Sequence, residues 1–327
     1  MGTRRMTMLL AVALSALTLG AAGCGDDDDG GGEAPSGEGQ ASGIDLSGQQ
    51  FTVGSKEFTE QLILGEITLQ VLEDAGAEVK DQIGLEGSTA ARNALTSGEI
   101  DMYWEYTGTA WTNYLNNEDP IPDEQEQYEA VKEEDAQNDI AWLEPTPFND
   151  TFAIAVRSDT GEAALDEVET ISDLAELAGS NPELATFCLG EEFSTRPDGF
   201  PGMTKAYGFE VPSENTSVVG DSVVYQQTAD GSKCNFGSVF STDGRIQSLD
   251  LRVLEDDENF FPFFNAALNV RQQVLDQNEQ LPELFNPIAE TLDDETITGL
   301  NAQVDVDGER PEDVVSSFLE ENGFTSG

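Results

Sequence analysis

Trp104-Glu105-Tyr106-Thr107-Gly108-Thr109-Ala110-Trp111 is the stretch that decides how this chain folds, because a predicted strand ends in it and a helix begins. Residues 100–104 (IDMYW) have the pattern of a short strand, and Thr107 or Thr109 is placed to cap the following helix. Free backbone N–H groups at a helix start attract an anion, and α/β sheets hold ligands at the carboxyl ends of their strands. The ring of Tyr106 adds a π-face, which binds a quaternary ammonium. The stretch therefore predicts a site for a small zwitterion, and the alternative is an aromatic strand packed into a core.

The N-terminus has the pattern of a secretory signal peptide, which we place at residues 1–23. Arg4 and Arg5 precede an uncharged apolar run that is short for a membrane span, and small residues lead up to Cys24. A cysteine in this position resembles the lipobox of bacterial lipoproteins, although Ala21 stands where leucine is usual. We therefore expect a lipid on Cys24 and a protein anchored on the extracytoplasmic face of the cell membrane. The alternative is a plain secreted protein.

Charge is the most unusual feature of the composition. The chain has 14 basic and 65 acidic residues and a formal net charge of −51. A surface this acidic repels itself at low salt and is screened at high salt, which indicates a halophilic habitat. It also excludes nucleic acid as a partner, because phosphate binding needs clustered lysine and arginine. Residues 24–48 contain almost no large apolar side chain, so we expect them to form a disordered acidic linker.

The absence of histidine excludes histidine-based catalytic triads and histidine metal ligands. With no cluster of metal ligands and no paired carboxylates beside a nucleophile, we expect neither an enzyme nor a bound cofactor or metal. If Cys24 carries a lipid, Cys188 and Cys234 remain as a pair. Outside the cytoplasm such a pair more often forms a disulfide than two free thiols.

The order of the predicted elements indicates two α/β units. Strand patterns at 51–54, 79–84 and 100–104 alternate with helical patterns, which predicts a parallel α/β sheet. After a buried strand at 152–156 the alternation begins again and continues to about 260. A strand at 266–270 and several helices follow, and these helices are expected to cover the first unit. We therefore predict lobe I at 49–154 plus 262–327, lobe II at 155–261, and two crossings near 152 and 265.

Six segments carry a resemblance to a known family. They are VGSKEFTEQLILGE (53–66), LTSGEIDMYWEYTGT (95–109), FNDTFAIAVR (148–157), RPDGFPGMTKAYGF (196–209), FSTDGRIQSLDLRVLEDD (240–257) and FFPFFNAALNVR (260–271). In this order they resemble the substrate-binding proteins of ABC importers for glycine betaine, carnitine and choline. The resemblance covers nearly everything from residue 50 onward. It implies a two-lobed, type II periplasmic-binding-protein fold with two hinge crossings.

The resemblance also implies which residues bind the ligand. The family holds a trimethylammonium group in a box of aromatic rings, and the box positions fall on Tyr106, Phe152, Tyr225 and the neighbourhood of Leu249. Because Leu249 is not aromatic, the box is three-sided unless Phe240, Phe264 or a tryptophan closes it.

Polar positions of the family site also fall on this chain. Thr109 and Lys56 correspond to groups that bind the ligand carboxylate, and Asp150 corresponds to an acidic residue at the box. Arg196 is an additional candidate of our own, since a guanidinium can grip a carboxylate with two parallel bonds; the alternative is an ion pair on the lobe surface.

These observations predict a monomeric binding protein that captures a small zwitterionic or cationic solute between two closing lobes. It would deliver the solute, most simply glycine betaine, to the membrane permease of an ABC importer. The alternatives are the same fold binding choline, carnitine, proline betaine or ectoine, and a solute-sensing subunit.

Overall fold

A computed structural model of the chain describes residues 43–117 and 121–325. The predicted signal peptide, Cys24 and most of the predicted linker therefore lie outside the described residues. The last part of that linker lies within them and is folded. Leu46 is fully buried, and its N–H donates to the carbonyl of Ala75 at 2.8 Å. The linker prediction is thus too long at its C-terminal end, because Leu46 and the partly buried Ile44 pack on the core.

The first sheet has five strands in the order β2-β1-β3-β10-β4. The strands are β1 (Gln50–Lys56), β2 (Glu78–Leu85), β3 (Met102–Tyr106), β4 (Ile140–Asn149) and β10 (Asn265–Arg271). β1 pairs in parallel with β2 and β3, as predicted, but β10 pairs antiparallel with both β3 and β4. The reason is that the chain returns to this sheet at its carboxyl edge, where Ala266 lies opposite Tyr106 and Asn265 opposite Asn149.

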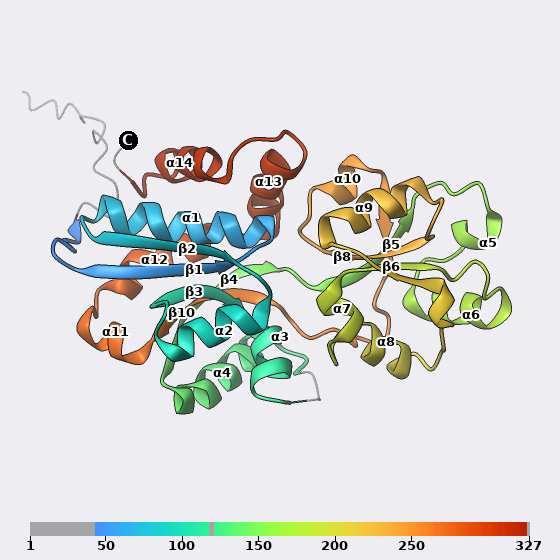
Figure 1. The fold of residues 1–327 in the computed structure, drawn as a ribbon, viewed down its shortest axis with the longest axis horizontal. Coiled ribbons are helices and arrows are strands. Elements are labelled where there is room, and N and C mark those ends of the chain that lie inside the picture. The colour runs from blue at the N-terminus through green and yellow to red at the C-terminus, as the bar shows by residue number, and fades with distance from the viewer. Residues whose placement is uncertain (1–42, 118–120, 326–327) are drawn as a thin grey trace, which may run out of the picture. The chain divides into compact units, whose positions relative to one another are not determined.

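Helices cover both faces of the first sheet (Figure 1). They are α1 (Thr59–Asp74), α2 (Ser88–Ser97), α4 (Glu124–Asp135), α11 (Gln272–Gln277), α12 (Leu281–Thr291), α13 (Asp294–Asp305) and α14 (Pro311–Glu321). α13 and α14 pack on α1, and α12 packs on β4. The C-terminal helices therefore return to the first sheet. We call this sheet and its helices lobe I.

The second sheet has the order β7-β6-β8-β5-β9. Its strands are β5 (Phe152–Arg157), β6 (Phe187–Leu189), β7 (Thr216–Val218), β8 (Phe236–Phe240) and β9 (Leu251–Val253). The helices of this part, which we call lobe II, are α5 (Ala163–Asp166), α6 (Ile171–Ser180), α7 (Glu191–Thr195), α8 (Phe200–Ala206), α9 (Asp221–Asp230) and α10 (Arg245–Ser248). β6 is parallel to β7 and β8, whereas β5 is antiparallel to β8 and β9. A disulfide between Cys188 in β6 and Cys234 fastens β6 to the segment that enters β8.

Two crossings join the lobes, and both run between carboxyl edges. The first lies between Asn149 at the end of β4 and Phe152, which pairs with Phe240 at the end of β8. It therefore comes slightly earlier than the predicted boundary at 154, because the apolar run from Phe152 belongs wholly to the second sheet. The second crossing lies between β9 and β10. The carboxyl ends of the parallel strands of both sheets are thus at the crossings.

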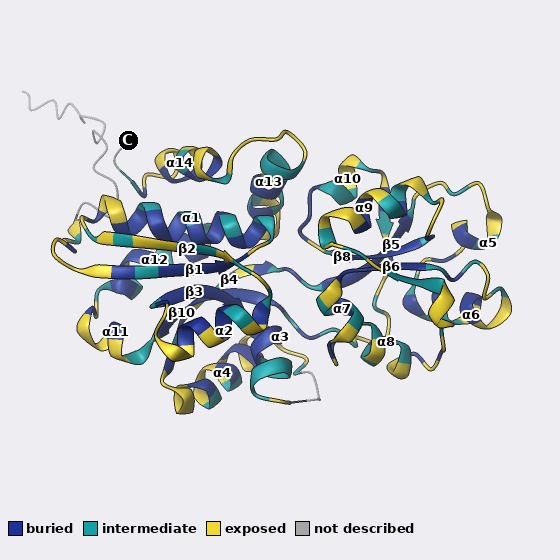
Figure 2. Cartoon of the chain, in the orientation of Figure 1, coloured by how far each residue is buried: buried dark blue, intermediate teal, exposed yellow. Residues whose placement is uncertain are grey.

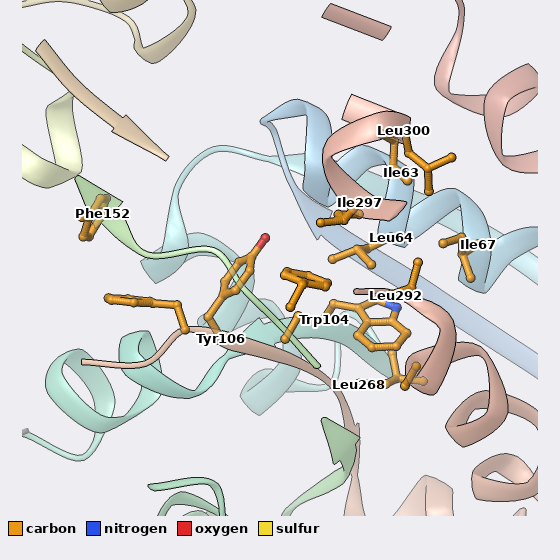
Figure 3. Close-up of a cluster of buried hydrophobic side chains, with 14 of the residues drawn as sticks. Ile63, Leu64, Ile67, Trp104, Tyr106, Phe152, Leu268, Leu292, Ile297 and Leu300 are labelled. Carbon is orange, nitrogen blue, oxygen red and sulfur yellow. The ribbon is translucent and has the colours of Figure 1, made fainter. Parts of the chain in front are cut away.

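The core is continuous from lobe I to the first crossing. Trp104 and Tyr106 share one face of β3, since alternate residues of a strand point the same way. Figure 3 shows the apolar cluster extending from Ile67 and Trp104 to Tyr106 and on to Phe152. The inner strands of both sheets are mostly buried, whereas exposed residues collect on the edge strand β2 and on the outer helices (Figure 2). Within residues 43–117 and 121–325, none of the helices has the length and apolar character needed to cross a membrane.

Candidate ligand-binding site

A small cavity of about 30 Å³ lies at the carboxyl edges of both sheets. Its aromatic lining comes from the loop before α1, from β3, β5 and β8, and from the second crossing: Phe58, Tyr106, Phe152, Phe240 and Phe264. We call these five rings the aromatic box. The polar lining consists of Lys56, Ser88, Thr109, Asp150, Glu192 and Arg196. The structure therefore brings six of the seven predicted ligand-binding residues to one cavity.

The rings of the box contact one another. Phe58 and Phe240 are stacked with centroids 5.4 Å apart and planes within 7°. Phe152 lies 5.4 Å from Phe240 and meets Phe264 edge to face at 5.5 Å. These are favourable aromatic geometries. In this conformation the rings therefore pack against one another and leave only a small cavity. The cavity has room for about one or two water molecules.

Lys56 and Arg196 already have protein partners. The Lys56 Nζ donates to Glu105 Oε1 at 2.6 Å and lies 5.0 Å from the centroid of the Tyr106 ring. Arg196 donates to both carboxylate oxygens of Asp198, at 2.8 and 2.5 Å. Its guanidinium lies 4.9 Å from the centroid of Phe152. Both cations therefore lie over ring faces of the box while carboxylates balance their charge.

Glu105 explains why a buried lysine is tolerated here. This carboxylate is fully buried on the face of β3 opposite Tyr106. It accepts hydrogen bonds from Lys56, from the hydroxyls of Tyr103 and Tyr114, both at 2.7 Å, and from the Tyr106 N–H. A buried charge is stable only when it is paired and hydrogen-bonded in this way. Glu105 thus fixes Lys56 at the end of β1.

A second buried carboxyl cluster lies on the other side of the box. The Tyr106 hydroxyl donates to Glu60 Oε1 at 2.8 Å. The Thr242 hydroxyl lies 2.6 Å from Glu60 Oε2 and 2.8 Å from Asp150 Oδ1. Burial raises the pKa of Asp150 well above its usual range, and the charge of Glu60 raises it further. Burial also raises the pKa of Glu60, against hydrogen bonds from Thr242, Asn301 and Tyr106.

Several side chains join the lobes around the cavity. Glu192 of α7 accepts from the Ser88 N–H at 2.7 Å and from its hydroxyl at 2.9 Å, so it caps α2 of the other lobe. The Thr112 hydroxyl donates to Asp198 at 2.8 Å, and the Arg196 guanidinium donates to Thr109 Oγ1 at 3.3 Å. Burial alone would raise the pKa of Glu192, but the charges of Lys56 and Arg196 and the Ser88 N–H hold it below its usual value. The lobes are therefore closed on the box.

A larger cavity of about 900 Å³ adjoins the box and shares Phe58, Asp150, Glu192 and Phe240 with it. Its lining is strongly acidic and includes Glu57, Glu60, Glu86, Glu191, Asp221, Asp243 and Asp305, with Arg245 as the basic member. A cleft of one charge sign concentrates ligands of the opposite charge. The approach to the box therefore favours a ligand with a positive group.

Tyr225, the seventh predicted residue, does not line either cavity. It is buried in a separate cluster with Leu249, its hydroxyl accepts from the Phe240 N–H at 3.0 Å, and Arg245 lies 4.2 Å from its ring centroid. Tyr225 belongs to the middle of α9, whereas Phe240 is at the end of β8. The strand end reaches the cavity and the helix does not. Phe240 and Phe264, named from the sequence only as rings that could close the box, are both in its lining.

Sequence reasoning missed four groups that the structure places at the site: Phe58, Glu60, Glu105 and Glu192. Phe58 and Glu60 lie two and four positions after Lys56 in the segment KEFTE (56–60), and Glu105 is adjacent to Tyr106. Their proximity to predicted site residues was the available signal. Glu192 had none, because its contact with Ser88 depends on how the lobes close.

Comparisons with known proteins agree with this geometry. The family model described as the substrate binding domain of the ABC-type glycine betaine transport system matches residues 49–321. A glycine-betaine-binding protein of Pseudomonas aeruginosa is 39% identical over 279 residues, 84% of this chain and 88% of that protein. An ergothioneine transport permease/ergothioneine binding protein of Helicobacter pylori is 34% identical over 84% of this chain and 48% of its own length.

Comparison with solved structures leads to the same class of proteins. The structure of apo YehZ from Escherichia coli matches with a TM-score of 0.62 and 32% identity, covering 84% of this chain and 99% of that one. The architecture is thus that of type II periplasmic binding proteins. Proteins of this class are extracytoplasmic, bind a small solute and work with a permease, and they are not enzymes. This chain belongs to the family of substrate-binding domains of ABC-type glycine betaine transport systems.

Proposed function

We propose that this protein captures a solute with a quaternary ammonium group in the aromatic box, and that glycine betaine is its principal ligand. The observation that carries the proposal is the convergence of five aromatic rings, from both lobes and the second crossing, on one cavity that also holds Lys56 and Arg196. A desolvated quaternary ammonium gains about 2 kcal/mol or more over an aromatic face.

The ligand carboxylate has two candidate partners. The ammonium of Lys56 has three N–H donors, and its hydrogen bond to Glu105 occupies one. Arg196 has five donors, and its bonds to Asp198, Glu192 and Thr109 leave one unused. A zwitterion would thus satisfy both ends of the site. For a ligand to enter, the stacked rings of Phe58 and Phe240 must separate, because a trimethylammonium group is much larger than the cavity of about 30 Å³.

Calorimetric titration of the purified chain in molar salt tests the proposal. The ligands are glycine betaine, choline, carnitine, proline betaine and ectoine, with ergothioneine added because one relative is named for it. Tight binding of glycine betaine that is lost in Tyr106→Ala is expected. Binding of ectoine alone, which has no quaternary nitrogen, would contradict the box. Preference for choline or carnitine would keep the box and change the ligand.

The acidic lining of the large cavity specifically favours the choline alternative, since choline carries a net positive charge. A solute-sensing role would use the same closed form with a receptor in place of the permease. Co-purification with a permease and an ATPase, rather than a receptor, would decide between the two roles.

We further propose a monomer held on the extracytoplasmic face of the cell membrane by a lipid on Cys24, in a halophilic organism. The lipobox-like sequence before Cys24 and the net charge of −51 support these points. Screening weakens repulsion among exposed carboxylates. The midpoint of thermal unfolding should therefore rise steadily between 0.1 M and 2 M potassium chloride. An unchanged midpoint would count against the salt-rich habitat, and a Cys24→Ala chain that remains in the membrane fraction would count against the lipid.

A further inference from the structure

The Thr242 hydroxyl lies between two buried carboxyl groups and cannot satisfy both as an ionised pair. Its oxygen is 2.6 Å from Glu60 Oε2 and 2.8 Å from Asp150 Oδ1, and the two acidic residues are only 3% and 4% exposed. A threonine hydroxyl has one hydrogen to donate. If it donates to one carboxylate, the other short contact requires a proton on the carboxyl group itself. The two short contacts therefore require one proton in addition to the hydroxyl hydrogen of Thr242.

The hydrogen-bond donors around the pair show which carboxyl carries the proton. Glu60 accepts from the Tyr106 hydroxyl at 2.8 Å and from Asn301 Nδ2 at 3.0 Å, as well as from Thr242. Within the described residues, the donors to Asp150 come from Thr242 alone. Hydrogen bonds to a carboxylate stabilise its charged form. Glu60 is therefore the ionised member and accepts the hydroxyl hydrogen of Thr242, whereas Asp150 is protonated and donates its hydrogen to the Thr242 oxygen.

Each neighbouring cation in the described part of the chain is paired with a carboxylate outside the pair. The titratable and charged groups beside it, from all packed elements, are Tyr106 of β3, Lys56 of β1, Glu192 of α7, Arg196, Asp243, and Arg245 of α10. Lys56 is bound to Glu105, Arg196 to Asp198, and Arg245 to Asp243 and Asp305. Asp243 adds negative charge near Asp150. These surroundings agree with the raised pKa values of Glu60 and Asp150.

Asp150 lines the aromatic box as well as the larger cavity, so its charge is felt by a ligand. We propose that Glu60 and Asp150 share one proton in the closed lobes, and that a cationic ligand expels this proton whereas a zwitterionic ligand leaves it in place. This inference rests on the proposed function, because it takes the box as the ligand site. A cation such as choline brings a net positive charge, which the ionised Asp150 would balance. Glycine betaine brings its own carboxylate and needs no such balance.

Proton release by the two ligands tests the proposal. Choline and glycine betaine are titrated calorimetrically at pH 7 in two buffers that differ in ionisation enthalpy. We expect close to one proton released for each choline bound and none for glycine betaine. The choline affinity should then rise by up to about tenfold per pH unit until Asp150 is ionised, while the glycine betaine affinity stays constant. Equal proton counts for both ligands, zero included, would overturn the proposal.

Matched variants locate the proton. Asp150→Asn should abolish proton release with choline, because the amide has no acidic proton. Glu66→Gln is the control: Glu66 lies on the same helix as Glu60, outside both cavities, and burial raises its pKa too. Proton release should persist in this control. Persistence of proton release in Asp150→Asn would overturn the assignment.

A measurement without ligand separates this inference from the proposed function. Infrared spectroscopy distinguishes the carbonyl stretch of a protonated carboxyl group from the bands of a carboxylate. The wild-type chain should show one buried protonated carboxyl at pH 7, and Asp150→Asn should lack it. If neither ligand binds, the proposed function fails, and the infrared band still decides whether the pair holds a proton. If Asp150→Asn does not fold, absence of the band from the wild-type spectrum would by itself overturn the inference.

Discussion

Phe240 connects the aromatic box to the interior of lobe II. Its ring stacks on Phe58, and its backbone N–H donates to the hydroxyl of Tyr225. Tyr225 lies beneath it, with its ring covered by Arg245. The ring that faces the cavity is therefore that of Phe240, and the tyrosine supports its position. A ligand would contact the first residue directly and feel the second only through the backbone.

Substitution at these two positions should thus have different effects. We expect Phe240→Leu to weaken glycine betaine binding by about tenfold or more, since it removes a π-face. Tyr225→Phe keeps the supporting ring and loses one hydrogen bond, so the affinity should change by about threefold or less. Calorimetry of both variants measures this. A larger loss of affinity in Tyr225→Phe than in Phe240→Leu would mean that Tyr225, and not Phe240, contacts the ligand.

Individual site residues were predictable from the sequence where a local pattern marks them or where the family resemblance supplies their position. Tyr106 ends β3 and Thr109 follows it, so the strand pattern placed both near a carboxyl edge. Lys56, Asp150 and Phe152 came from the resemblance. Tyr225 and Phe240 are fifteen positions apart, and both are aromatic. Which of them reaches the cavity depends on the packing of α9 against β8. That packing cannot be predicted from the local pattern of a single sequence.

Among the elements, α2 has an N-terminus that is capped by a side chain of the other lobe. Its first residue, Ser88, donates through its N–H and its hydroxyl to Glu192 of the other lobe. A carboxylate at a helix N-terminus satisfies free N–H groups and interacts favourably with the helix dipole. Because α2 and α7 belong to different lobes, this cap exists only in the closed form. The contact therefore favours closure.

Removal of the cap should shift the protein toward an open form. Charge-assisted hydrogen bonds contribute about 1.5–3 kcal/mol each, so Glu192→Ala should weaken ligand binding by roughly tenfold to a hundredfold. Small-angle X-ray scattering with saturating ligand should show a larger radius of gyration than for the wild type. Glu191→Ala is the matched control, since Glu191 is the exposed neighbour on the same helix. Equal scattering curves for all three proteins would contradict the role of the cap.

The elements themselves were largely predictable, and their directions were not. Apolar periodicity located α1, β5 and β10 within a few residues, because α1 is rich in apolar residues at helical spacing and the two strands are buried along almost their whole length. The reversed direction of β5 and β10 comes from the crossings, which join carboxyl edge to carboxyl edge. Periodicity contains no information on strand direction, so the prediction of a parallel first sheet was only partly right.

At the scale of the whole molecule, buried carboxyl groups and the acidic surface make stability depend on pH. The pKa values of Asp150 and Glu60 are raised by burial, and burial with the charges of Glu192 and Glu57 raises the pKa of Asp221 to about 6. These groups bind more protons in the folded than in the unfolded chain. Their stabilising contribution is complete below the unfolded pKa of about 4 and is lost as pH rises through the folded pKa.

The free energy of unfolding should therefore fall as pH is raised from 5 to 8. Linkage gives about 1.4 kcal/mol per pH unit for each proton by which the two states differ. Thermal unfolding followed by circular dichroism at constant molar salt measures the change. In Asp150→Asn the free energy of unfolding should depend less steeply on pH. Stability that increases from pH 5 to pH 8 would contradict the assignment of the buried carboxyls.

The most direct test of the aromatic box is a pair of ligands with the same shape and different charge. Glycine betaine and 3,3-dimethylbutanoate differ in that a carbon replaces the quaternary nitrogen. If the five rings bind the ligand through its positive charge, glycine betaine should bind at least about thirtyfold more tightly, which corresponds to about 2 kcal/mol. Equal affinities in calorimetry would mean that the rings provide only an apolar surface, and the central claim would be wrong.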